Sequence, residues 1–234
     1  MIGYKRIQLI VERALRLSAN TGDKIITYGD GNLYPQEIAN LIYASKTASA
    51  AVEKLTENII CEGFKNKEFR DMTNDNGLNM DDILENTAND LARFKGWTWI
   101  VQYGLREGGY VPVGVYNVPF EYVRAEKSEN YLKDPKIYKW RVFNNWDRQT
   151  VKATQVMQNS TVYSTYDPKN APNEIADCGG LENYNGQLLY VNLCTTRPYP
   201  ISTFHSVRNE MDAENKNGRY VSRTLGAASI CVPS

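Results

Sequence analysis

Histidine and paired cysteines are nearly absent from this sequence. The 234 residues contain one histidine, His205, and four cysteines, none of which forms a C-x-x-C pair. Zinc sites take several Cys and His ligands, so the chain is poorly supplied for one. A serine or cysteine nucleophile most often takes its base from a histidine, and no G-x-S-x-G elbow accompanies His205. We therefore expect no catalytic residue, no metal ligand and no cofactor, and we interpret His205 as a capping or packing residue.

A surplus of charge and a long apolar run are missing too. The 27 basic and 27 acidic residues give a net charge of zero, and the pI is about 6.6. Dedicated nucleic-acid binders often have a pI above about 9, so we expect no tight grip on phosphates, although a neutral protein can still surround a duplex. No apolar run approaches the ~18 residues of a membrane span, and residues 1–20 lack the apolar core of a signal peptide. We expect a protein kept in a cytoplasm, with reduced cysteines and no membrane contact.

The glycine-rich and asparagine-rich stretches do not complete a binding motif. Gly29 and Gly31 lack both the third glycine and the Lys-Ser/Thr pair of nucleotide-binding loops. The loop at 72–83 has Met72 and Ile83 at the two positions where a calcium loop requires carboxylates. Solvated turns are the better interpretation of both segments.

Acidic residues gather between 62 and 90, where eight acidic and three basic residues give a net charge of −5. A metal-dependent nuclease or other DNA-processing enzyme could draw on the carboxylates between 71 and 90, and this alternative stays open. The simpler interpretation is a solvated helix face. Asp81 and Asp82 fall in a predicted first helical turn, where the helix dipole favours negative charge.

Apolar residues recur at helical spacing through the first hundred residues. The pattern predicts a basic amphipathic helix over 1–20, a helix opened by Pro35, a helix capped by Ser45 or Thr47 and stopped at Gly63, and a helix from Asn79 to Gly96. The predicted apolar face of the third helix consists of Ala48, Ala51, Val52, Leu55 and Ile59.

Strand signals follow Gly96. Aromatic and β-branched residues predict strands over 97–103, 110–116, 118–124, 137–143 and 187–193, with a hairpin loop at 105–109. A polar, proline-containing stretch at 158–185 precedes the last strand, and a helix is predicted over 202–215. We therefore expect an α+β protein with N-terminal helices, a mostly antiparallel sheet and a C-terminal helix. The expected division is an N-terminal helical segment, 1–64, packed as one unit with an α+β domain, 65–234.

Several short motifs follow one another along the chain. The run Y-G-D-G-N-L-Y-P-Q at 28–36 contains Gly29, Asn32, Tyr34, Pro35 and Gln36, and S-K-T-A-S follows at 45–49. The next predicted helix ends in I-I-C-E-G-F at 59–64, with Gly63 and Phe64. Farther on come N-V-P-F-E-Y-V-R at 117–124, with Pro119 and Arg124, then N-N-W at 144–146, and Y-P-I-S-T-F-H-S at 199–206, with Tyr199 and Pro200. In order and spacing, these motifs resemble tailed-bacteriophage portal proteins across most of residues 20–215.

The resemblance implies a wing-like fold and a structural role at one vertex of a phage capsid. Such subunits form rings, usually dodecamers, through which DNA is packaged and ejected without tight binding. Their partners are the terminase large subunit, the major capsid protein and head–tail connector proteins. The protein would be made in the bacterial host cytoplasm and would end up in the virion.

The sequence also departs from that family. Cys61 stands where the family's helix ending has its first glycine. Portal proteins continue past the equivalent of 218–234 into stem helices, a clip and a crown, for which this sequence has no counterpart. We therefore expect the wing portion of a portal, or a split or reduced relative. A head-completion adaptor is the other open alternative.

Overall fold

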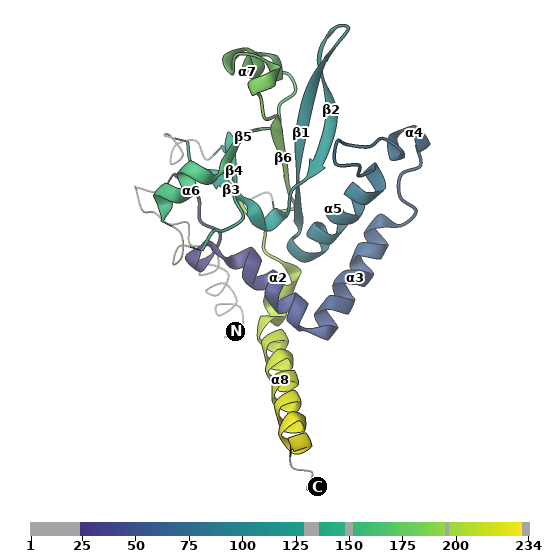
Figure 1. Cartoon of the computed structure of the whole chain (residues 1–234), viewed down its shortest axis with the longest axis vertical. Helices are drawn as coiled ribbons and strands as arrows, with labels where there is room; N and C mark the ends of the chain where they lie inside the picture. Colours follow the sequence, from purple (N-terminus) through teal and green to yellow (C-terminus); the bar gives the residue numbers. More distant parts are fainter. Residues whose placement is uncertain (1–23, 129–135, 148–151, 195–196, 231–234) are drawn as a thin grey trace, which may run out of the picture.

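The computed structural model describes residues 24–128, 136–147, 152–194 and 197–230. The amphipathic helix predicted over 1–20 lies outside these residues. Figure 1 shows a central sheet, helices packed beside one of its edges, and a last helix that extends away from the rest of the molecule.

The chain between residues 30 and 94 is helical, and local sequence signals fix where its helices begin. A 3-10 turn, η1 (Asp30–Asn32), leads into α2 (Tyr34–Ala44), α3 (Lys46–Ile60), the short α4 (Lys67–Arg70) and α5 (Met80–Phe94). Pro35 lies in the first turn of α2, and the Ser45 hydroxyl accepts a hydrogen bond from the Ala48 amide at 3.1 Å. Asn79 and Asp82 form a reciprocal capping box at the start of α5. The predicted helix starts are confirmed.

The predicted stops of α3 and α5 at Gly63 and Gly96 are too late. Cys61, with φ +50°, caps α3, and Lys95, with φ +61°, caps α5. Glycine is the usual residue at a positive φ after a helix, so the prediction favoured the nearest glycine. Gly96 instead opens a strand, where an added Cβ would lie 2.8 Å from the ring of Phe120.

The sheet has six strands in the order β2-β1-β6-β5-β4-β3 within the described residues. They are β1 (Gly96–Arg106), β2 (Gly109–Asn117), β3 (Val123–Glu126), β4 (Lys139–Val142), β5 (Thr161–Thr165) and β6 (Gln187–Asn192). All neighbouring pairs are antiparallel except β5 and β6, which meet through two residue pairs. The expected α+β class with a mostly antiparallel sheet is confirmed.

Two parts of the strand prediction are wrong. Residues 118–124 hold a 3-10 turn, η2 (Phe120–Tyr122), because Pro119 interrupts the ladder and the buried Asp90 carboxylate accepts the Phe120 amide at 3.1 Å. The polar stretch 158–185 contains β5, α7 (Ala171–Asp177) and the 3-10 turn η3 (Leu181–Asn183), and α6 (Ala153–Asn159) runs into it. These elements are short, and their polar composition hides their period.

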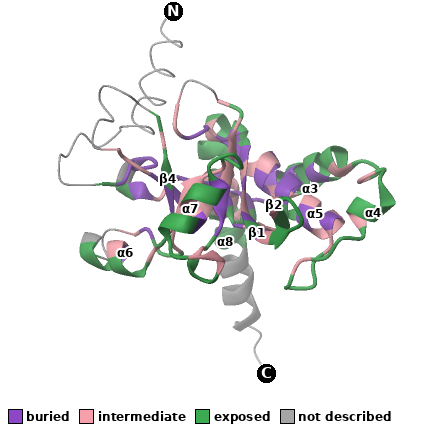
Figure 2. Ribbon diagram, turned by 90° about the horizontal axis from the view of Figure 1, so that it is seen from above, coloured by how far each residue is buried: buried purple, intermediate pink, exposed green. Residues whose placement is uncertain are grey.

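The core lies between the sheet and helices α2, α3 and α5 (Figure 2). Ala48 and Val52 of α3 are buried in it as predicted. Ala51, Leu55 and Ile59 are exposed, the last two by 42% and 38%, so this part of the predicted apolar face is wrong within the described residues. Fewer residues of α3 pack against the core than its apolar pattern predicts.

The last helix is longer than predicted. A 3-10 turn, η4 (Thr203–Val207), leads into α8 (Arg208–Ile230), whose first turns lie against α2 and whose remainder extends from the body (Figure 1). Among the described residues, no helix combines the length and the apolar character needed to cross a bilayer.

Candidate functional site: a buried arginine hub and the adjoining groove

Arg124 of β3 is fully buried, with 0% of its surface exposed. Its guanidinium has five N–H donors, and each has an acceptor. Nε donates to Asn32 Oδ1 at 2.8 Å, and Nη2 donates to Asn32 O at 2.7 Å and to Gln36 Oε1 at 3.1 Å. Nη1 donates to the carbonyls of Glu121 and Val123, both at 2.9 Å. The side chain thus joins β3, the turn before it and the start of α2.

None of these five acceptors is a carboxylate, so carbonyl and amide dipoles stabilise the buried charge. The rings of Tyr28 and Trp146 add to this, with their centroids 5.5 and 5.2 Å from the guanidinium carbon. Burial lowers the pKa of Arg124 to about 10, which still leaves it protonated at neutral pH. With all its donors in use, the guanidinium has none left for a ligand.

Asn32 links the Arg124 guanidinium to the turn that contains Gly29 and Gly31. Its Oδ1 also accepts the Tyr28 amide at 2.8 Å, and its backbone has φ +67°. Gly29 and Gly31 have φ values of +78° and +65°, so the turn needs residues that tolerate a left-handed backbone. The G-D-G-N sequence supplies them and directs the asparagine side chain inward.

Two tyrosines, Tyr28 and Tyr199, connect the surroundings of Arg124 to the segment near residue 200. The rings of Tyr28 and Tyr199 are stacked, with centroids 4.3 Å apart and planes within 6°. The Tyr199 hydroxyl donates to Ile26 O at 2.6 Å and accepts from the Ala125 amide at 2.8 Å, while the Tyr28 hydroxyl donates to Pro200 O at 2.5 Å. Burial raises the pKa of Tyr28 well above its ordinary value, so this phenol stays neutral.

Most of the motif residues meet here. We define the arginine hub as Tyr28, Asn32, Tyr34, Gln36, Arg124, Trp146, Tyr199 and Pro200; Gly29 and Pro35 lie within the same turn and helix start. Pro119 is exposed at the start of η2, close in sequence to the carbonyl of Glu121. Gly63 and Phe64 lie elsewhere, beside Asp81 and the ring of Phe69.

Two hub residues were missed as site residues. Tyr28 and Trp146 stand inside the quoted motif runs 28–36 and 144–146, but nothing local marks a tyrosine or tryptophan as a partner of a distant arginine. The only sequence signal was the high aromatic content, with 16 Tyr and 4 Trp.

Three carboxylates of the acidic segment have clear structural partners. Asp82 completes the capping box of α5, Asp75 accepts the Tyr116 hydroxyl at 2.9 Å, and Asp90 is paired with Arg93 at 2.8 Å. Within the described part of the chain, no three Cys, His, Asp or Glu side chains are grouped as metal ligands would be. No described contact favours the nuclease alternative.

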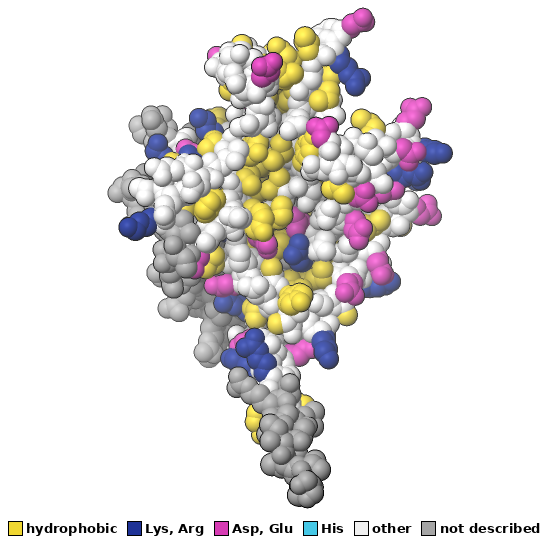
Figure 3. Space-filling model, viewed as in Figure 1, with side chains coloured by type: hydrophobic (Ala, Val, Ile, Leu, Met, Phe, Trp, Pro, Cys, Tyr) yellow, Lys and Arg dark blue, Asp and Glu magenta, His cyan; other side chains and the backbone are white. Residues whose placement is uncertain are grey.

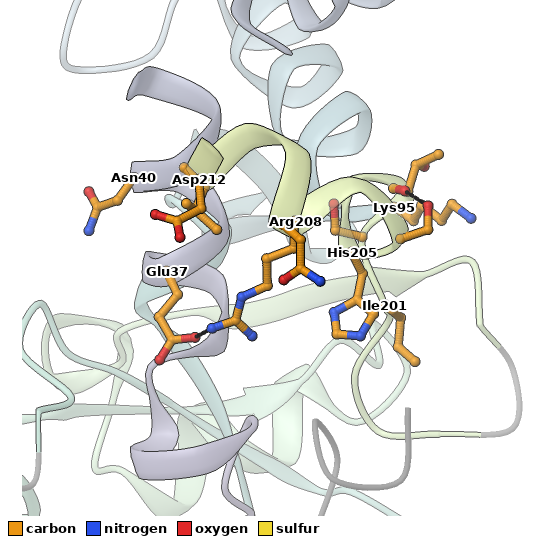
Figure 4. Close-up of a pocket in the computed structure, with 12 residues that line it drawn as sticks. Glu37, Asn40, Lys95, Ile201, His205, Arg208 and Asp212 are labelled. Carbon is orange, nitrogen blue, oxygen red and sulfur yellow. Dashed lines mark hydrogen bonds and ion pairs between the residues drawn. The ribbon is translucent and has the colours of Figure 1, made fainter. Parts of the chain in front are cut away.

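A groove of about 1130 Å³ lies beside the hub, where α8 leaves the body. Figure 4 shows Arg208 of α8 reaching across it to Glu37 of α2, with an N–O distance of 2.9 Å. Farther along α8, the Glu214 carboxylate accepts hydrogen bonds from the Ser45 hydroxyl and from the amide and hydroxyl of Thr47, the latter two at 3.3 and 3.2 Å. These contacts fasten the base of α8 to α2 and α3.

His205 lines the same groove next to Ile201 (Figure 4). Its ring lies 5.5 Å from that of Tyr34, and neither ring nitrogen has a hydrogen-bond partner. Burial, and then the charge of Arg208, lower the pKa of His205. No serine or cysteine within the described residues bonds to this imidazole, so the structure shows packing and no nucleophile–base pair.

Comparison of the chain with protein-family models, with curated proteins and with solved structures found no match.

Proposed function

We propose that this chain is a portal-type structural subunit: the wing portion of a ring through which phage DNA is packaged and ejected. One observation carries the proposal. The motif segments 28–36, 117–124 and 199–206 lie far apart in the sequence, yet their polar and aromatic side chains bond to one another in the arginine hub. Such contacts are expected if the three segments belong to one inherited fold.

The hydrogen bonding of Arg124 and the zero net charge support a structural role without tight DNA binding. The donors of Arg124 are all satisfied within the chain, and the net charge is zero. Each phosphate contact made by a cation releases counterions and tightens DNA binding, so a channel through which DNA slides is better served by few such contacts. The proposed channel therefore admits DNA without gripping it.

The position of α8 also supports the proposal. The helix is fastened at its base by Arg208–Glu37 and by Glu214, and it then extends away from the body (Figure 1). In portal proteins the chain continues from the equivalent region into the stem that lines the channel. We therefore place α8 towards the ring axis, and propose the terminase large subunit, the major capsid protein and head–tail connector proteins as partners at the portal vertex of the virion.

The direct test is the assembly state of the purified chain. Mass photometry and negative-stain microscopy are expected to show closed rings of identical copies, a dodecamer in keeping with the family. A chain that stays monomeric at every concentration, with or without its phage partners, would refute the proposal. If that monomer bound a separate portal ring from the same phage, it would be a head-completion adaptor.

A further inference from the structure

The two lateral edges of the subunit carry opposite charge. Residues 53–85, which span most of α3, α4 and the start of α5, contain nine acidic and four basic residues, a net charge of −5. The described residues between 126 and 164, which form β3, β4, α6 and β5, contain five basic and two acidic residues, a net charge of +3. The net charge of the chain is zero although its charges are distributed unevenly between the two groups.

These two groups lie at opposite ends of the sheet. β2 and β3 are its outermost strands, α5 packs against β1 and β2, and Arg141 of β4 bonds to Ser160, which follows α6, at 2.9 Å. Both ribbon views place α3, α4 and α5 on one side and α6 on the other (Figures 1 and 2). Figure 3 shows more acidic than basic side chains over the first group, with a few basic ones among them near α4, and scattered basic side chains over the second.

The exposed charges define two surfaces. We name as the acidic edge the surface around Glu62, Glu68, Asp71, Asp75 and Glu85, and as the basic edge the surface around Lys136, Lys139 and Lys152; all eight residues are exposed. Arg141 is buried in an ion pair with Glu126 at 2.7 Å, so it contributes little to the outer field. Lysines thus dominate the exposed charge of the basic edge.

Apolar side chains accompany the charges on both edges. Leu55 and Ile59 of α3 and Phe69 of α4 are 42%, 38% and 39% exposed at the acidic edge. Tyr138 is 46% exposed at the basic edge. The α3 residues belong to an apolar helix face that the described residues leave uncovered. Apolar side chains surrounded by charged ones are the composition of a protein–protein contact.

We propose that the acidic edge of one copy docks against the basic edge of the next. This inference rests on the proposed ring function and specifies its subunit contact. A two-fold contact at either edge would set like charges against one another, whereas a head-to-tail contact pairs opposite charges at every junction. Because the two edges lie at opposite ends of the sheet, each copy can bind two neighbours at once, as a ring requires.

Charge reversal of each edge tests the pairing. The first variant carries Glu62→Lys, Glu68→Lys and Glu85→Lys, which change the charge of the acidic edge from −5 to +1, and the second carries Lys139→Glu and Lys152→Glu, which change that of the basic edge from +3 to −1. Each variant alone then has two edges of one sign, and we expect its half-assembly concentration in mass photometry to rise at least about tenfold. An equimolar mixture of the two is expected to assemble, because positive and negative edges alternate again. A chain with all five substitutions has the signs of its edges exchanged and is expected to assemble as well.

Matched controls reverse exposed charges away from both edges. Glu107→Lys at the β1–β2 turn and Lys169→Glu before α7 should leave assembly unchanged. Circular dichroism of every variant checks that the chain is folded, and the recovery of assembly in the mixture excludes misfolding as the cause of its loss. Wild-type assembly should weaken as NaCl concentration rises, because salt screens exposed charges.

The outcomes separate this inference from the proposed function. If the wild type forms rings and both edge variants still form them, the edge pairing is overturned and the ring function stands. Edge variants that lose assembly but do not regain it on mixing would overturn the head-to-tail arrangement. A wild-type chain that never assembles would overturn the ring function, and the edge pairing with it.

Discussion

Replacement of Asn32 by alanine is the sharpest test of the arginine hub. The Asn32 Oδ1 atom accepts two buried N–H groups, the Tyr28 amide and Arg124 Nε, each at 2.8 Å. Alanine leaves both donors without an acceptor, at a cost of about 1–3 kcal/mol each. The backbone adds to this, because alanine at φ +67° costs about 1 kcal/mol more than a residue that tolerates the left-handed region. We expect Asn32→Ala to lower the free energy of unfolding by about 3–7 kcal/mol.

Asn32→Gly separates the two contributions. Glycine removes the same acceptor but adopts the left-handed backbone without strain, so we expect a loss about 1 kcal/mol smaller than that of alanine. Urea unfolding followed by tryptophan fluorescence measures both variants, and Trp146 lies over the Arg124 charge as a local probe. The exposed Asn76→Ala serves as the control and should stay within about 0.5 kcal/mol of the wild type. If Asn32→Ala cost less than about 1 kcal/mol, the asparagine would not organise the hub.

Two further predictions concern a buried carboxylate of α5 and glycines of β1 and α8. Burial raises the pKa of Asp90 from 3.8 to about 6, so the folded chain binds this proton more tightly than the unfolded chain. The free energy of unfolding should therefore fall as the pH rises from about 4 to 6. Asp90→Asn should remove this pH dependence, as measured by urea unfolding at a series of pH values. Gly96→Ala places a Cβ 2.8 Å from the Phe120 ring and the Val191 carbonyl and should lower the free energy of unfolding by about 1–3 kcal/mol. In α8, a Cβ at Gly218 would extend into open space, so Gly218→Ala should raise the free energy of unfolding by about 0.5–1 kcal/mol. Thermal unfolding measures both variants.

Features set by neighbouring residues could be predicted from the sequence. The caps at Ser45 and Asn79 and the turn of α2 that holds Pro35 depend on side chains within four residues of the atoms they satisfy. The helix ends were less predictable, because Cys61 and Lys95 adopt positive φ values that local preference assigns to glycine. The turn at 120–122 was missed because it depends on Asp90, far away in sequence.

The hub itself could not be read from local pattern. Arg124 stands in a short strand, where a charged residue normally points to solvent, and its burial depends on acceptors from residues 32 and 36 that lie 92 and 88 positions away. The motif order pointed to Asn32, Gln36 and Arg124 as a group without indicating that they bond. Periodicity also predicted that Leu55 and Ile59 belong to an apolar face, but it cannot tell whether the same chain or another covers that face.

The tyrosine stack also dictates when the molecule can become complete. The hydrogen bonds that Tyr28 and Ile26 share with Pro200 and Tyr199 span 172 and 173 positions of the chain. During synthesis the segment around Ile26 and Tyr28 leaves the ribosome long before Tyr199 and Pro200 are made, so the environment of Arg124 stays open until residues near 200 have emerged. Contacts between such distant segments form slowly. The packing around Arg124 is therefore completed late, and a neighbour that requires the folded subunit can bind only after residues near 200 have been synthesised.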